Sequence, residues 1–141
     1  MAAGQLAGSW PRWITASYQR LVGEPLCAPP ELYALPAVVL CHDTSPDPLF
    51  VYANAAAQAL WERSWEDFIG WPSRLTAPAQ ARAERAAALA GAGVVRGYTG
   101  VRVSASGRLF RIHDATVWTV SDDAGQVVGQ AATFERVTLR V

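Results

Sequence analysis

Two short runs of the sequence hold the residue types of nucleophilic and acid–base catalysis, Cys41-His42-Asp43 and His113-Asp114. Proteins activate nucleophiles by placing a thiol against an imidazole or an imidazole against a carboxylate. Both runs lie in stretches typical of β-strands, where adjacent side chains point to opposite faces. Neighbours therefore cannot form a dyad, and only a cross-strand meeting of Cys41 with His113 would create one. We interpret His42 as a strand-end histidine rather than a haem ligand.

The sequence lacks the signatures of metal and phosphate chemistry. Its two cysteines, Cys27 and Cys41, form no CxxC pair and have no histidine at metal-ligand spacing. No glycine-rich phosphate loop follows a strand. We therefore predict no metal site and no catalytic residues, and the sequence leaves any cofactor unknown.

Composition narrows the class of protein. The chain has 141 residues, 51% of them hydrophobic, which suits one domain with an ordinary core. With a formal net charge of +0, the chain lacks the excess of positive charge that is typical of proteins that bind nucleic acids or anionic membranes. Every basic residue is an arginine, which together with the many alanines favours a bacterial origin. With no signal-peptide pattern at the start and no long apolar run, we expect a cytoplasmic protein.

The elements that must position these residues follow from the hydrophobic pattern. An amphipathic helix is predicted from about Ser9 to Val22, and a proline-rich arm follows it. Residues 1–35 thus form an N-terminal helix and arm, and residues 36–141 form the main domain. Strands are predicted at 37–41 and 49–53, followed by small helices capped by Asn54 and Ser64. An alanine-rich helix begins at Pro78, and three long strands with tight turns complete the chain.

This order indicates an α+β fold with one antiparallel sheet and helices packed on one face. It resembles a PAS fold, which has five strands around a central pocket. The segments "VVLCHDTSPDPLFVYANAAAQALWERSWEDF", "PSRL", "YTGVRVSASGRLFRIHDATVW" and "GQAATF" are similar to those of the bacterial MEKHLA-domain family. The resemblance implies a PAS-like fold and a role in sensing or protein interaction, but no catalytic residues. No motif resembles the flavin-reactive cysteine of light-sensing PAS relatives.

The centre of this fold either is filled by packed side chains or contains a small-molecule pocket, and the pocket is the more specific hypothesis. In the strand 108–120, regular alternation puts the larger aromatic residues on the face that meets the helices. Asp114 and Thr116 would share that face and become either polar anchors for a ligand or groups paired inside the core, Asp114 for instance with Arg74. A β-bulge would reverse the assignment. The predicted ligand-pocket residues are Asn54, Trp61, Phe110, Ile112, Asp114, Thr116 and Trp118.

The apolar stripe of the N-terminal helix has two interpretations, which the sequence leaves open. It covers its own domain's sheet, or it joins two copies of the chain through Trp10, Trp13, Ile14, Tyr18 and Leu21. We therefore predict a non-enzymatic sensory or protein-interaction domain that binds a small molecule and signals through a partner protein or a homodimer. The alternatives are a dimerisation module with a filled core and a small enzyme that uses Asp114 as an acid or base.

Overall fold

The computed structural model describes residues 7–90 and 93–139, and the residues outside these ranges, including the first six of the stretch searched for a signal peptide, lie beyond it. Its helices are α1 (Trp10–Val22), α2 (Ala55–Trp61), α3 (Trp65–Phe68) and α4 (Arg82–Ala88), with short 3₁₀ turns η2 (Pro29–Glu31), η3 (Ser73–Thr76) and η4 (Ala79–Ala81). Its strands are β1 (Val38–Asp43), β2 (Phe50–Ala53), β3 (Val94–Val103), β4 (Leu109–Ser121), β5 (Val127–Phe134) and β6 (Arg136–Thr138). None of the described helices is long and apolar enough to cross a membrane.

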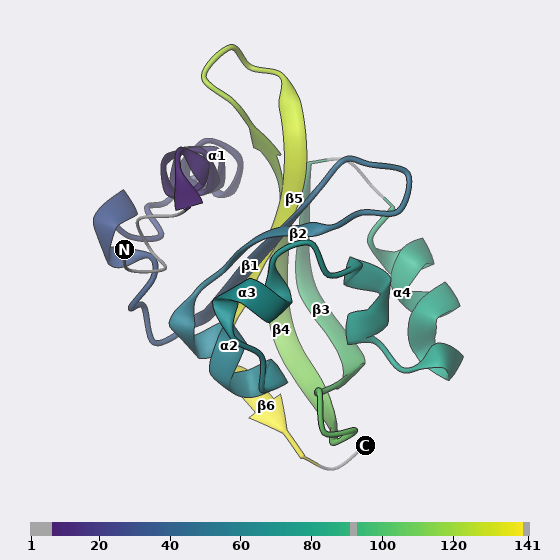
Figure 1. Cartoon of the computed structure of the whole chain (residues 1–141). Helices are drawn as coiled ribbons and strands as arrows, with labels where there is room; N and C mark the ends of the chain where they lie inside the picture. The colour runs from purple at the N-terminus through teal and green to yellow at the C-terminus, as the bar shows by residue number, and fades with distance from the viewer. Residues whose placement is uncertain (1–6, 91–92, 140–141) are drawn as a thin grey trace.

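The strands form one antiparallel sheet in the order β2-β1-β5-β4-β3, and the short β6 pairs with β4. The first strand of the chain therefore lies beside β5 in the middle of the sheet (Figure 1). The β3–β4–β5 part is the predicted meander, and the helical segment between β2 and β3 connects the two halves. The predicted α+β, PAS-like sheet is confirmed.

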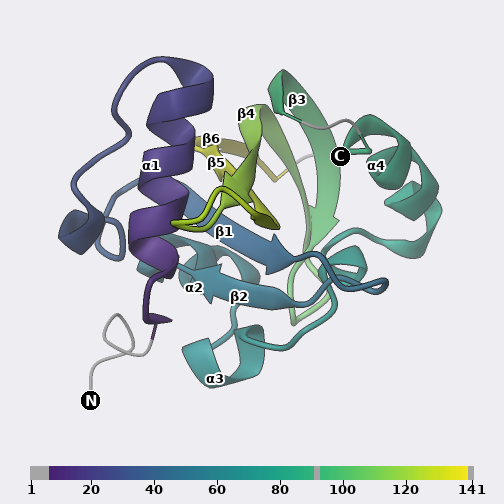
Figure 2. The same ribbon diagram turned by 90° about the horizontal axis from the view of Figure 1, so that it is seen from above.

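Helices cover both faces of the sheet, with α1 on one side and α4 on the other (Figure 2). Two groups of buried residues follow this division. The α1 side includes Ile14, Tyr18, Trp118 and Val120. The opposite side, which α2 also covers, includes Trp61, Phe68, Phe110, Ile112 and Phe134.

The N-terminal helix is docked on its own domain. Ile14 is fully buried, and its carbonyl oxygen accepts a 3.1 Å hydrogen bond from the indole Nε1 of Trp118. Tyr18 packs edge-on against Trp118 at a centroid distance of 4.8 Å, and Ser17 accepts a hydrogen bond from the amide of Ser121. Ile14 and Tyr18 are thus unavailable to a second copy while the helix stays docked.

Asn54 fixes the junction between β2 and α2. Its side-chain oxygen accepts hydrogen bonds from the amides of Ala57 and Val39. Its side-chain nitrogen donates to the carbonyl oxygens of Leu32 and Leu35 in the arm and, at 2.8 Å, of Ala37 just before β1. The predicted cap is confirmed, and the same side chain also attaches the arm and β1. Ser64 caps α3 in the same way, by accepting from the amide of Asp67.

The regular alternation predicted for the strand 108–120 is wrong, because β4 contains a bulge at Asp114. Asp114 has φ of 53°, a left-handed conformation, and its side chain is exposed. The extra residue shifts the phase of the strand by one position. Phe110 and Ile112 therefore face α2, whereas Trp118 and Val120 face α1.

Candidate functional site

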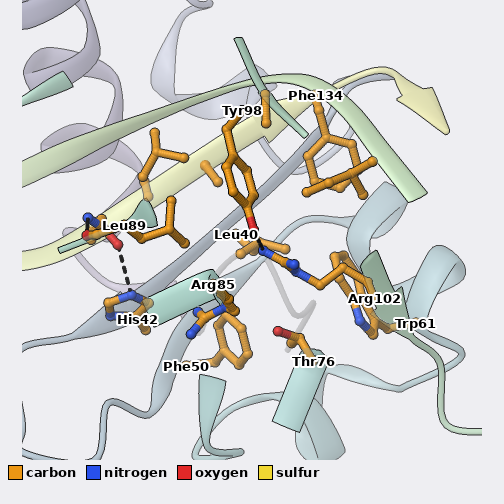
Figure 3. Close-up of a pocket in the computed structure, with 16 residues that line it drawn as sticks. Leu40, His42, Phe50, Trp61, Thr76, Arg85, Leu89, Tyr98, Arg102 and Phe134 are labelled. Atoms are coloured by element: carbon orange, nitrogen blue, oxygen red, sulfur yellow. Dashed lines mark hydrogen bonds between the residues drawn. The ribbon is translucent and has the colours of Figure 1, made fainter. Parts of the chain in front are cut away.

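A small cavity lies between the sheet and the segment that carries η3 and α4 (Figure 3). Its volume is about 40 Å³, enough for a few water molecules and far below the hundreds of Å³ of a drug-sized site. The lining comes from the strands β1 to β5, the helices α2 and α4 or their ends, and the turn η3. The lining residues are Leu40, His42, Phe50, Trp61, Thr76, Arg85, Leu89, Tyr98, Arg102, Ile112, Ala115, Val117, Gln130, Ala131, Ala132 and Phe134.

The structure brings two of the predicted pocket residues to the wall of this cavity and a third next to that wall. Trp61 and Ile112 line it, and Phe110 packs against Trp61 with ring centroids 5.3 Å apart. Asn54 is fully buried away from the lining, and its hydrogen-bonding groups are used by the backbone contacts described above. Asn54 therefore has a structural role.

The other three predicted pocket residues lie elsewhere because of the bulge. Asp114 and Thr116 line a different, open groove of about 460 Å³, together with His113. Trp118 is buried beneath α1. The proposed pairing of Asp114 with Arg74 does not occur, since Arg74 forms a 3.1 Å salt bridge with Asp47.

The candidate catalytic pairs do not form a dyad in the described residues. Cys41 is fully buried within the group of side chains beneath α1, and this burial raises the pKa of its thiol strongly. His113 instead lies at a hydrogen-bonding distance of 2.8 Å from the hydroxyl of Thr138. No group of three or more metal-ligating side chains occurs among the residues that the structure describes.

Sequence reasoning missed the charged lining of the cavity, which consists of Arg102 on β3 and Arg85 on α4. Arg102 is only 5% exposed. It donates to the carbonyl oxygen of Val101 at 2.9 Å and to the hydroxyl of Tyr98 at 3.0 Å, and its guanidinium lies 5.3 Å from the Tyr98 ring centroid. Neither arginine is in a salt bridge with any residue of the described ranges.

Arg85 is the second cation of the cavity. Its Nε is buried without a hydrogen-bond partner in the described part of the chain. Burial and, to a smaller extent, the nearby charge of Arg102 lower the pKa of Arg85 to about 10. Figure 3 shows Arg102 beside the Tyr98 hydroxyl and Arg85 above Phe50, and both side chains line the same cavity. With a pKa of about 10, the Arg85 guanidinium still carries its charge at neutral pH, within mainly apolar walls.

Gly100 makes room for this arrangement on β3. A Cβ atom at Gly100 would meet the side-chain tip of Tyr98 and would lie 2.9 Å from Nη1 of Arg102. Only glycine lets both side chains fold against the strand at this point. The positions of the Tyr98 hydroxyl and the Arg102 guanidinium therefore depend on Gly100.

A polar chain links the cavity wall to the end of α4. Nδ1 of His42 lies 2.8 Å from the carbonyl oxygen of Asp43, and its Nε2 lies 3.2 Å from Oε1 of Gln130. Gln130 in turn donates from Nε2 to the carbonyl oxygen of Leu89 at 3.1 Å. Burial lowers the pKa of His42, and the charge of Arg85 lowers it further. Movement of α4 would therefore alter the hydrogen bonds that connect Leu89 through Gln130 to His42 on β1.

Comparisons with known proteins agree with this architecture. A family model described as the MEKHLA domain matches residues 8–139, a range that includes α1 as well as the sheet. No curated protein sequence matches the chain.

Solved structures share the fold at low sequence identity. The PAS domain of a Colwellia psychrerythraea protein has 16% identity and a TM-score of 0.66, over 78% of this chain and 93% of that one. An RNA-binding light–oxygen–voltage receptor has 20% identity and a TM-score of 0.59, over 72% of this chain and 29% of that one. The photo-excited blue-light photoreceptor Vivid has 18% identity and a TM-score of 0.55, over 70% of this chain and 76% of that one.

Proposed function

Because the chain belongs to the MEKHLA domain family and has the fold of a PAS domain, we propose that it is a non-enzymatic sensory domain. In this proposal a small molecule enters the cavity beside Trp61, and the resulting change passes to a partner protein. We place this protein in the bacterial cytoplasm.

The observation that carries the proposal is a central cavity closed by a weakly anchored helix. No residue of η4 or α4 is fully buried, although Arg85 and Leu89 complete the cavity wall. The Nε of Arg82 donates to the carbonyl oxygen of Ala77, and Gln130 holds the carbonyl oxygen of Leu89. Segments with few buried contacts open at low free-energy cost, so α4 is suited to admit and report a ligand.

Native mass spectrometry and an absorption spectrum of freshly purified full-length protein test this function. We expect a bound small molecule, or a rise in melting temperature when a metabolite library is added. An apo mass together with no stabilising compound would contradict the sensory function.

An interaction domain without a ligand is the second candidate, and the small cavity volume of about 40 Å³ favours it. This candidate predicts that filling the cavity with the Ala115→Val substitution leaves partner binding intact. The sensory function predicts that the same substitution blocks the response to a ligand.

Signal output needs a partner, and we propose the outer side of α1 as the surface for a second copy of the chain. Trp10 and Trp13 are half-buried and stack edge-on at 5.2 Å, and Leu21 is 37% exposed. Size-exclusion chromatography with light scattering tests this homodimer. We expect Leu21→Asp to convert a dimer to a monomer that keeps its fold, and a monomeric wild-type protein would contradict the proposal.

A further inference from the structure

The cavity holds more positive charge than its surroundings balance. Only 5% of the surface of Arg102 is exposed, and no described carboxylate forms a salt bridge with Arg102 or Arg85. A buried charge is normally paired, because leaving water costs it much of its stabilisation. The two guanidinium groups also repel each other, and this repulsion contributes to the lowered pKa of Arg85.

The cavity also holds more hydrogen-bond donors than acceptors. A guanidinium offers five N–H donors, and Arg102 has one acceptor for Nη1 and one for Nη2 in the structure. The Nε of Arg85 and the indole Nε1 of Trp61 are buried without acceptors among the described residues. The missing partner is therefore rich in acceptor atoms and negatively charged.

The remaining walls limit the size and polarity of that partner. Phe50, Ile112, Ala115 and Phe134 provide apolar surface beside the guanidinium groups. At roughly 10–15 Å³ per water-sized group, the volume of about 40 Å³ admits only about three or four non-hydrogen atoms. These limits match a carboxylate group with a short hydrocarbon tail.

We propose, on the basis of the sensory function above, that the cavity binds a small organic carboxylate of about one or two carbons. Arg85 and Arg102 hold the carboxylate oxygens, as guanidinium groups hold carboxylates elsewhere. The hydrocarbon tail lies against Phe50 and Ile112. Since Arg85 belongs to α4 and Arg102 to β3, the bound anion ties α4 to the sheet.

Binding of the full-length protein to formate, acetate, propionate and butyrate tests the proposal, at constant ionic strength. The controls are acetamide and propionamide as neutral isosteres, and chloride and phosphate as inorganic anions. For a ligand of four non-hydrogen atoms the tightest Kd is about 40 µM, so titrations extend to tens of millimolar. The readouts are the melting temperature and the ¹⁵N-arginine Nε resonances.

We expect formate or acetate to raise the melting temperature and to shift the resonances of Arg85 and Arg102, whereas the larger propionate and butyrate bind more weakly and the amides do neither. Arg102→Met and Arg85→Met should each weaken binding about ten- to a hundredfold, the usual effect of losing hydrogen bonds to a charged group. Arg96→Met, on the exposed part of β3, is the matched control and should bind normally.

The basal melting temperature separates ligand binding from a structural role. Replacing an unpaired buried charge with methionine should leave Arg102→Met as stable as the wild type or more stable in carboxylate-free buffer. If Arg102→Met fails to fold, Arg85→Met on α4 keeps the test decisive. Equal destabilisation of Arg102→Met in every buffer would overturn the proposal.

The outcomes also distinguish this proposal from the broader function. Binding of an amide or another neutral compound at the cavity would contradict the carboxylate proposal and would remain consistent with the sensory function. Equal binding of chloride or phosphate would likewise reject it in favour of a general anion site. If no compound binds and the purified protein is apo, both proposals fail.

Discussion

At the residue scale, Asn54 shows how one buried side chain holds three segments of the chain together. It caps α2, accepts from the amide of Val39 on β1, and donates to the carbonyl oxygen of Leu32 in the arm. Each of these backbone groups lies where water cannot replace the lost partner. The residue is therefore required for folding and leaves no free group for a ligand.

Substitution of Asn54 should destabilise the domain more than substitution of an ordinary helix cap. Asn54→Ala loses a cap worth about 1 kcal/mol and leaves buried backbone groups unpaired at about 1–3 kcal/mol. We expect a total loss of about 3 kcal/mol in urea denaturation. Ser64→Ala, which removes the single cap bond of α3, is the control and should cost about 1 kcal/mol. Equal losses for the two variants would show that the additional contacts of Asn54 contribute nothing.

His42 should make the domain less stable in acid. Burial holds the pKa of the folded-state imidazole below its ordinary value, and the charge of Arg85 acts in the same direction. As the pH falls below about 6.5, the unfolded chain takes up a proton before the folded chain does. Stability is therefore complete above this pH and is lost during acidification.

Denaturant titrations between pH 7.5 and pH 5 measure this effect. The free energy of unfolding of His42→Gln should depend less on pH than that of the wild type. The control His113→Gln, which changes a histidine on β4, should still lose stability in acid. The groups nearest to His42 that also affect the profile are Asp43 on its own strand and Arg85 on α4. An unchanged profile in His42→Gln would rule out this origin of the acid loss.

At the element scale, the contact between β1 and β5 depends on the absence of a side chain at Gly129. This glycine pairs with Asp43, and a Cβ atom there would meet the carbonyl oxygen of His42 and lie 3.1 Å from Sγ of Cys41. A backbone atom cannot rotate aside as the end of a side chain can. The two halves of the chain join in the middle of the sheet at this point.

Gly129→Ala should therefore destabilise the domain by about 2–3 kcal/mol, at the upper part of the range for overpacking. Gly100→Ala is the informative comparison, since the atoms nearest to its new methyl group belong to the side chains of Tyr98 and Arg102 rather than to the backbone. It should cost about 1 kcal/mol or less and displace the Arg102 guanidinium. Thermal denaturation and ¹⁵N-arginine spectra would show both effects, and equal stability losses would be inconsistent with this explanation.

The elements were predictable from the sequence because capping and periodicity are local properties. Asn54 and Ser64 were identified as caps, and the strands followed from apolar runs and turns. The phase of β4 was not predictable, since a left-handed aspartate leaves no pattern in the residues around it. The error of one position moved Asp114, Thr116 and Trp118 away from the cavity.

Arg102 was predictable in principle. The short turn after β3 pairs Arg102 directly with Phe110, and directly paired residues of an antiparallel ladder lie on the same face. Once Phe110 was assigned to the helix side, Arg102 belonged there too. Arg85 gave no such signal, because its burial depends on how α4 folds back over the sheet.

At the scale of the whole molecule, the sheet has a separate group of buried side chains on each face, and α1 seals one of them. Ile14, Tyr18 and Trp118 belong to the α1 side, whereas Trp61 and Phe110 belong to the cavity side. The family match from residue 8 includes this helix. The helix is therefore part of the structural unit.

Loss of the α1 contact should destabilise the whole domain. Ile14→Ala should cost about 2–4 kcal/mol, the usual range for truncating a fully buried aliphatic side chain. Leu21→Ala on the same helix, where the side chain is 37% exposed, should remain within about 0.5 kcal/mol of the wild type. Chemical denaturation measures both, and an unaffected Ile14→Ala variant would show that α1 undocks independently.

The bulge in β4 has a consequence for how this chain tolerates insertions and deletions. Even-numbered residues point to the cavity in the first part of the strand, residues 109–113. After Asp114, in residues 115–121, even-numbered residues point to α1. Removing Asp114 would restore regular alternation and leave both parts of the strand on their present faces. Straightening the strand with Asp114 retained would instead force either Phe110 and Ile112 or Trp118 and Val120 onto the wrong face. One residue of irregular backbone thus lets all four side chains be buried on their own faces although their numbers share one parity.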